Sequence, residues 1–344
     1  MTRRLTRRVL HGLAAMLLSA ISIPAVLSGA QTSAREDPAA DLVRQGQQKL
    51  REGKPDEALV IYRQALQVSP RSFVANNQAG VVLDLSGKYA EARTHFTKAM
   101  EVAASPQQKA QARRSMAMSY AFEGDCANAA KFEAPVYEMH LAEKNFFDAG
   151  EVANELARVC LDAASLDDAE KWYRNGHDAG MREPDIKADR RDLWEFRWEH
   201  VQARIAARRG NKSDADRHVA AAKAILDRGT NPQQMQFFPY LVGYVALYSG
   251  DASTAVAELQ KANQSDPFIL CLIGESYEKL GRRDEAATYY RKALTVSTAH
   301  NPPSAYARRV TKKKLGASAW CAPSARERLA VQEPTGAVPA ARCL

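Results

Sequence analysis

The chain has 344 residues, with 48 Lys and Arg against 40 Asp and Glu, so its net charge is +8 and its pI is near 9.2. Hydrophobic residues make up 46% of the chain, which excludes a disordered protein, and charges interrupt them too often for a multi-span membrane protein. With 18 Gly and five scattered Cys, collagen-like and disulfide-framework proteins are excluded as well. The 61 alanines and the few aromatics favour helices that pack closely through small side chains.

The first thirty residues have the composition of an export signal. Four arginines within residues 1–10 precede an apolar run at residues 12–27, and small residues at 28–30 suit a signal peptidase. The run is shorter than the roughly 20 residues that a helix needs to cross a bilayer. We therefore expect a signal peptide at 1–30, a linker at 31–38 and an exported bacterial protein, periplasmic or secreted. The alternative is an uncleaved signal that anchors the chain in the inner membrane.

A pattern of small and large residues repeats through the body of the chain. Pairs of glycines seven residues apart occur at four places, and an alanine, a large residue and a second small residue follow each pair at fixed intervals. Small residues let two helices touch, and large ones fill the space between them, so the pattern predicts repeated helix–turn–helix units. The residues expected to make these contacts are Gly46, Ala58, Tyr62, Ala65, Pro70, Gly80, Ala92, Phe96, Ala99, Gly243, Ala255, Ala262, Gly274, Ala286, Tyr290 and Ala293.

This pattern resembles the tetratricopeptide repeat, a 34-residue unit with small residues at positions 8, 20 and 27 and a large residue at position 24. About seven such units fit residues 39–299, and the four best begin at residues 39, 73, 236 and 267. The resemblance implies an all-α fold, a right-handed α-solenoid of stacked helix–turn–helix repeats. Glu133 departs from it, because it stands at position 24 of the third unit. Irregular insertions at 181–193 and 230–235 would either bend the solenoid or divide it into two packed halves.

The C-terminal region differs from the repeats in charge. A last helix is expected at 304–315, and its basic face suits the polar cap of a solenoid, so we assign 300–316 to a capping helix. Residues 317–344 have no sustained period and are expected to form a mobile tail. The leader carries +4 and residues 304–344 carry +6, which leaves residues 31–303 at −2. The basic pI therefore does not indicate a nucleic-acid-binding surface.

Catalytic and metal-binding motifs are missing from the sequence. It has no Gly-rich phosphate loop, no His-Glu-x-x-His zinc helix and no hydrolase elbow. Glu195, Glu199 and His200 could share a helix face and bind a metal, but Arg197 and Arg204 nearby favour salt bridges. We therefore expect no enzymatic activity, no cofactor and no metal.

The five cysteines are an odd set, so at least one is unpaired within the chain. In the frame of the repeat, Cys126 and Cys160 fall near the same end of adjacent helices. A disulfide between them and two buried free thiols are both open alternatives. Cys321 and Cys343 lie in the expected tail, where they would pair or be reactive.

The resemblance also implies a binding function. Tetratricopeptide arrays present a concave groove lined by positions 2, 5, 9, 12 and 13 of each unit's first helix. In the third, fifth and sixth units several of those positions hold arginines and aromatics, the side chains that carry much of the binding energy at protein interfaces. The expected groove residues are Arg114, Met118, Phe122, Arg197, His200, Arg204, Arg208, Tyr240, Tyr244 and Tyr248. The alternative interpretation places the tyrosines in the helix–helix core and the arginines on a solvated face.

We therefore predict a non-enzymatic protein-interaction scaffold of the cell envelope. Its partner would be a protein or peptide with apolar and acidic residues, and membrane contact would come only from an uncleaved signal. One alternative is a non-catalytic subunit of an envelope enzyme or of a secretion or assembly complex. Another is an enzyme or carrier whose site matches no motif above.

Overall fold

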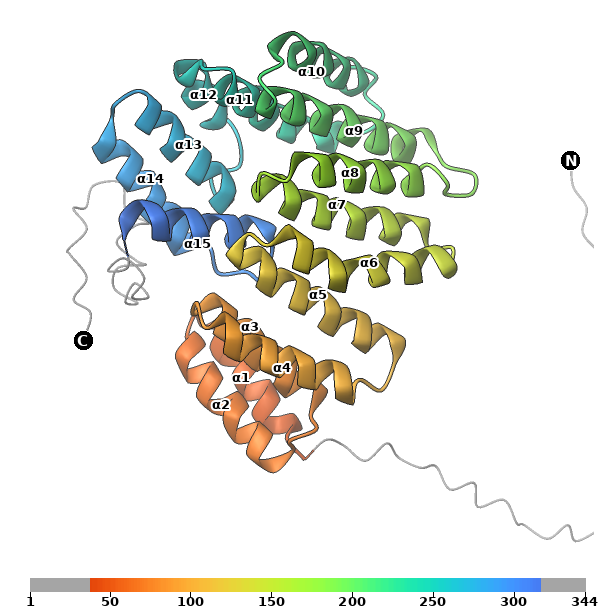
Figure 1. The fold of residues 1–344 in the computed structure, drawn as a ribbon, viewed down its shortest axis with the longest axis vertical. Helices are drawn as coiled ribbons and strands as arrows, with labels where there is room; N and C mark the ends of the chain where they lie inside the picture. The colour runs from red at the N-terminus through yellow and green to blue at the C-terminus, as the bar shows by residue number, and fades with distance from the viewer. Residues whose placement is uncertain (1–37, 317–344) are drawn as a thin grey trace, which may run out of the picture. The chain divides into compact units, whose positions relative to one another are not determined.

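The computed structural model describes residues 38–316, and every regular element within this range is a helix (Figure 1). The signal peptide expected at 1–30 and the tail expected at 317–344 lie outside the described residues. The α-helices are α1 (Ala40–Arg51), α2 (Pro55–Val68), α3 (Phe73–Leu85), α4 (Tyr89–Val102), α5 (Pro106–Glu123), α6 (Cys126–Ala142), α7 (Phe146–Asp162), α8 (Leu166–Gly180), α9 (Ala188–Arg208), α10 (Lys212–Leu226), α11 (Phe238–Tyr248), α12 (Ala252–Leu259), α13 (Pro267–Lys279), α14 (Arg283–Val296) and α15 (Pro302–Leu315); a 3-10 helix, η1 (Pro232–Phe237), precedes α11.

Successive helices pack in pairs, and each pair stacks on the next. Odd-numbered helices are the first helices of the units and even-numbered ones are the second, up to α14. The prediction of an all-α solenoid of stacked helix–turn–helix repeats is confirmed. Among the residues that the structure describes, no helix combines the length and the apolar character that crossing a membrane requires.

The small and large residues of the repeat meet between the two helices of a unit. A Cβ atom added to Gly46 would lie 2.5 Å from the ring of Tyr62, and one added to Gly80 would lie 2.5 Å from the ring of Phe96. The glycine therefore leaves the space into which the large side chain of the second helix fits. Of the sixteen residues expected to make the repeat contacts, the structure exposes Pro70 and buries the others.

The turn between the two helices of a unit needs a residue in the left-handed region. Gly250 meets this need between α11 and α12, with φ of 93°. Ala164 occupies the same place between α7 and α8, with φ of 65°. A side chain is unfavourable in this conformation, so the fourth unit carries backbone strain at Ala164 that glycine avoids elsewhere.

Two predicted irregular segments are more regular than expected. The sequence marks 181–193 as an insertion, but α9 already begins at Ala188 and is 21 residues long. Trp194 anchors the start of α9, because its buried indole lies where a Cβ atom on Gly150 or Gly180 would be. The 3-10 helix η1, residues 232–237, begins within the second segment, 230–235, and extends two residues beyond it.

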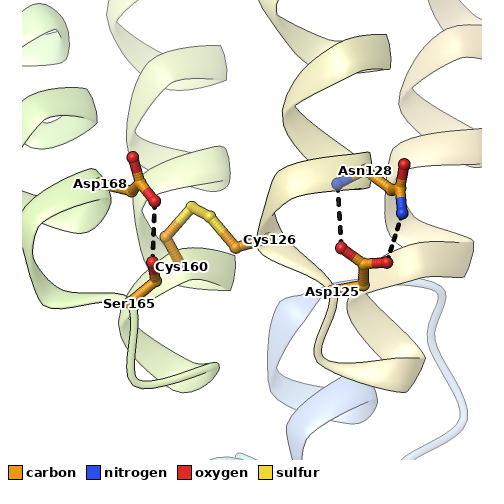
Figure 2. Close-up of a disulfide and its surroundings, with 6 residues drawn as sticks. All are labelled: Asp125, Cys126, Asn128, Cys160, Ser165 and Asp168. Carbon is orange, nitrogen blue, oxygen red and sulfur yellow. Dashed lines mark hydrogen bonds between the residues drawn. A yellow bond between two sulfur atoms is a disulfide. The ribbon is translucent and has the colours of Figure 1, made fainter.

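A disulfide joins α6 to α7 (Figure 2). Cys126 is the first residue of α6 and Cys160 lies in the last turn of α7, and their Cα atoms are 4.8 Å apart. Of the two alternatives for these cysteines, the structure contains the bridge. Cys271 is a buried free thiol, while Cys321 and Cys343 lie outside the described residues.

The last helix packs more widely than a terminal cap would. α15 contacts α14 and α13, as the next first helix of the array should, and it also contacts α5 and α7 (Figure 1). It therefore connects the end of the array with the third and fourth units instead of only covering the end.

Candidate partner-binding face

We call the inner face the side of the first helices that carries positions 2, 5, 9, 12 and 13 of each unit. Ten residues were predicted to line it as a groove. The structure brings most of them into contact with one another or with neighbouring helices, in three groups that differ in accessibility.

Arg204 and Arg208 of α9 bind tyrosines from neighbouring helices. Arg204 donates hydrogen bonds to the hydroxyls of Tyr240, at 2.9 Å, and Tyr173, at 3.1 Å. Arg208 donates to the Tyr244 hydroxyl at 3.2 Å, and its guanidinium lies 4.8 Å from the centre of the Tyr248 ring. Such charge-assisted and cation–π contacts hold a guanidinium in a place with little water.

Tyr240, Tyr244 and Tyr248, which we call the tyrosine stripe, therefore lie largely in the core. Tyr240 is 7% exposed, Tyr244 is 0% exposed, and Tyr248 is half-buried. The expectation of an open row of three tyrosines needs correction, because α9, α11 and α13 pack around them, with Phe268 stacked 6.5 Å from Tyr244. Burial raises the pKa of Tyr240 and Tyr244, as it does for any phenol removed from water.

His200 belongs to this same buried cluster. Its ring lies 5.6 Å from Phe196 and 5.1 Å from Tyr240. Burial, together with the positive charges of Arg204 and Arg158, holds the pKa of His200 well below its ordinary value of 6.5. His200 is therefore neutral at physiological pH and acts as an aromatic packing residue.

Arg114 and Arg197 form the accessible part of the predicted groove. The side chain of Arg114 in α5 is 44% exposed and pairs with Glu155 of α7. The side chain of Arg197 in α9 is 34% exposed and pairs with Glu151 of α7. Two Arg–Glu pairs thus follow one another across α5, α7 and α9 on the inner face.

Met118 and Phe122 of α5 are buried, contrary to their expected place in an open groove. Phe122 stacks between Tyr89, at 5.9 Å, and His300, at 5.5 Å between ring centres. His300 comes from the segment that leads into α15. The chain's own C-terminal region therefore covers this part of the inner face.

Sequence reasoning missed two charged residues of the inner face. Arg158 lies 4.3 Å over the ring of Phe268, and its Nε atom is 3.6 Å from an Asp162 carboxylate oxygen. Arg158 and Asp162 occupy positions 9 and 13 of the fourth unit. Applying the groove positions used for the other units to this unit would therefore have identified both residues. The more distant contact with Phe268, three units away, has no signal in the sequence pattern.

Glu133 is a buried carboxyl group in the third unit. It is 0% exposed where the best units have an aromatic ring or leucine, and neither of its oxygens has a hydrogen-bond partner among the described residues. The nearest cation is Arg114, whose Nε atom lies 3.9 Å away. Burial first, and then the negative charge of Glu155, raises the pKa of Glu133 well above 4.5, which favours the protonated form of this carboxyl group in the folded protein.

Glu195, Glu199 and His200 do not assemble into a metal site. Glu199 lies 2.6 Å from His218, and His200 packs among aromatic rings. Within residues 38–316, no group of three or more His, Cys, Asp or Glu side chains is arranged to hold a metal ion.

Comparison with known proteins identifies the repeat at both ends of the array. Residues 43–109 and residues 269–300 each match a family model described as a tetratricopeptide repeat. No curated protein matches the chain significantly.

Solved structures are similar to this chain, and one of them reaches a TM-score above 0.5. RapI in its apo form is 10% identical, with 75% of this chain and 97% of that chain covered and a TM-score of 0.51. A tetratricopeptide repeat protein from Parabacteroides merdae ATCC 43184 is 14% identical, with 74% and 91% covered and a TM-score of 0.47. A Rap protein complexed with Competence and Sporulation Factor is 12% identical, with 75% and 74% covered and a TM-score of 0.46. Residues 43–109 and 269–300 thus carry tetratricopeptide repeats, and the helix pairs between them stack in the same manner.

Proposed function

We propose that the protein is a non-enzymatic scaffold that binds a partner protein or peptide on its inner face. The observation that carries this proposal is the pair of accessible Arg–Glu contacts across α5, α7 and α9. Arg114 and Arg197 are held on rigid helices, and each is paired with a glutamate of the same protein. Guanidinium groups recognise carboxylates through paired hydrogen bonds, so an acidic residue of a partner can take the place of Glu155 or Glu151.

The preference for a partner with acidic and apolar residues rests on this accessible region alone. Arg204 and Arg208 already bind tyrosine hydroxyls, and opening those contacts would expose a buried cluster. Tyr248, which is half-buried beside Arg208, is the one residue of the tyrosine stripe that retains partial access for an apolar anchor.

The test is affinity capture from the native cell envelope with wild type and an Arg114→Ala, Arg197→Ala double variant. We expect the double variant to lose the captured partner while its circular dichroism stays unchanged. Arg174→Ala and Arg217→Ala, on the second helices α8 and α10, are matched controls because their side chains are 57% and 65% exposed and pair locally. Equal capture by the double variant and the wild type would contradict the proposal.

We also propose that the protein is exported from the cytoplasm. The composition of residues 1–30 supports this, and so does the Cys126–Cys160 bridge, because disulfides persist in oxidising compartments. N-terminal sequencing of the native protein should begin near residue 31. Recovery of an intact Met1 in the membrane fraction would support the anchored alternative.

A further inference from the structure

The C-terminal strap, which we define as residues 297–316, lies against inner-face positions of four different units. It comprises a short linker and α15. Although it follows the seventh unit in sequence, it contacts residues more than two hundred positions earlier in the chain.

The linker is fixed to α3 and α5 through a buried polar contact. The Nε2 atom of His300 lies 2.8 Å from one carboxylate oxygen of Asp84, and the hydroxyl of Ser119 donates to the other oxygen at 2.8 Å. The His300 ring also packs against Phe96 and Phe122, at 5.8 and 5.5 Å.

Two arginines of α15 bind the C-terminal ends of first helices. Arg308 donates to the carbonyl oxygen of Leu85, the last residue of α3, and Arg309 donates to that of Asp162, the last residue of α7, each at 2.6 Å. Terminal carbonyls lack partners within their own helix and carry the negative end of its dipole. These sites therefore favour cations.

The other side of the strap contacts α13. The hydroxyl of Tyr306 donates to Glu275 at 2.6 Å, its ring lies 4.6 Å from that of Phe268, and Lys314 pairs with Glu278. The surface under the strap thus offers carboxylates, helix carbonyls and the aromatic rings of Phe96, Phe122 and Phe268.

The covered residues share one property: Asp84, Leu85, Asp162, Phe268, Glu275 and Glu278 all occupy inner-face positions of their units. The strap meets them as a ligand would, with cations against acceptors and a tyrosine against a ring. We propose that the strap is an internal ligand of the inner face, and that the surface beneath it accepts a basic partner helix with an aromatic anchor, which binds by displacing the strap.

This inference rests on the proposed function, because it takes the inner face as the binding surface. It adds a second subsite whose preference is opposite to that of Arg114 and Arg197. A partner that carries an acidic segment and a basic helix would satisfy both subsites.

The test uses the full chain with a protease site inserted between Thr298 and Ala299, which are both exposed. The folded protein is cut there, the released segment is removed in high salt, and a fluorescent peptide of residues 300–316 is titrated by anisotropy. We expect the peptide to bind the cut protein and not the intact one. Arg308→Glu with Arg309→Glu in the peptide should weaken binding about tenfold or more, since each change removes a charge-assisted hydrogen bond. Lys313→Glu, at an exposed position of α15, should change binding less than about twofold, as expected for a screened surface charge.

Several results would overturn the inference. They are a segment that stays bound in high salt, loss of helical signal when the segment leaves, absence of peptide binding to the folded cut protein, or equal binding of the charge-reversed peptide. None of these results depends on Arg114 or Arg197. Failure of the capture experiment with the double variant would instead count against the proposed function and leave the peptide result standing.

Discussion

The contact between Gly80 and Phe96 allows a quantitative test of the repeat geometry. Gly80 lies inside α3, and a Cβ atom there would be 2.5 Å from one carbon of the Phe96 ring and 2.8 Å from two others. Carbon atoms prefer separations of about 3.5–4.0 Å, so Gly80→Ala requires the ring or the helix to move. Phe96 is itself fully buried and has little room to adjust.

Two opposing effects decide the magnitude. Alanine inside a helix is favoured over glycine by about 1 kcal/mol. Overpacking a well-filled contact costs about 1–3 kcal/mol. The net expectation for Gly80→Ala is a loss of roughly 1 kcal/mol in the free energy of unfolding.

A double-mutant cycle separates the two effects. Phe96→Ala alone should cost about 3–5 kcal/mol because it leaves a cavity. In that background the added methyl group has space, so Gly80→Ala should stabilise by about 1 kcal/mol. Urea unfolding followed by circular dichroism measures all four proteins, and the expected coupling is about 2 kcal/mol. If Gly80→Ala stabilised the protein equally in both backgrounds, the close packing of the Phe96 ring on Gly80 would not be the reason that the repeat needs a glycine at this position.

Four further substitutions test other parts of the fold. Ala164→Gly should stabilise the protein by roughly 0.5–1 kcal/mol, and Gly250→Ala should destabilise it by a similar amount, because both positions lie in the left-handed region. Melting temperatures that shift in the same direction for the two variants would refute this prediction. Cys126→Ala should lower the stability by about 3–4 kcal/mol in the chain-entropy treatment of the closed loop, and a reductant should destabilise the wild type but not the variant. Glu133→Gln should gain stability over the wild type as pH rises above about 4.5, since the folded state keeps a proton that the unfolded state releases; a constant difference between pH 4 and 8 would show that Glu133 ionises in place.

The sequence predicts the repeats well because their signal is local. Gly46 and Tyr62, or Gly80 and Phe96, lie sixteen residues apart in one unit, and the same packing problem recurs in each unit. The helix contact therefore leaves a periodic trace that a single sequence reveals. Where helices pack differently, as with Trp194 against Gly180, the period is lost, and residues 188–193 belong to α9 although the sequence marks them as part of an insertion.

The inner face was predicted less well because accessibility depends on distant contacts. The helical positions of Phe122 and Tyr244 follow from the repeat, but their burial does not. Phe122 is covered by His300, which is 178 residues away in sequence, and Tyr244 is enclosed by helices of neighbouring units. Periodicity shows which side of a helix a residue occupies, and it contains no information on what covers that side.

The contacts of the C-terminal strap also affect how the protein folds. In an open repeat array each unit contacts only its neighbours, so the ends can fray independently and folding can begin anywhere. The contact between His300 and Asp84 links residues 216 positions apart and gives the array an interaction that neighbouring units alone cannot provide. Because this contact closes a loop of 216 residues, we expect it to form late in folding. Once the contact is made, unfolding of one end of the array removes contacts that stabilise the other end. The units between Asp84 and His300 should therefore unfold together rather than one by one from the ends.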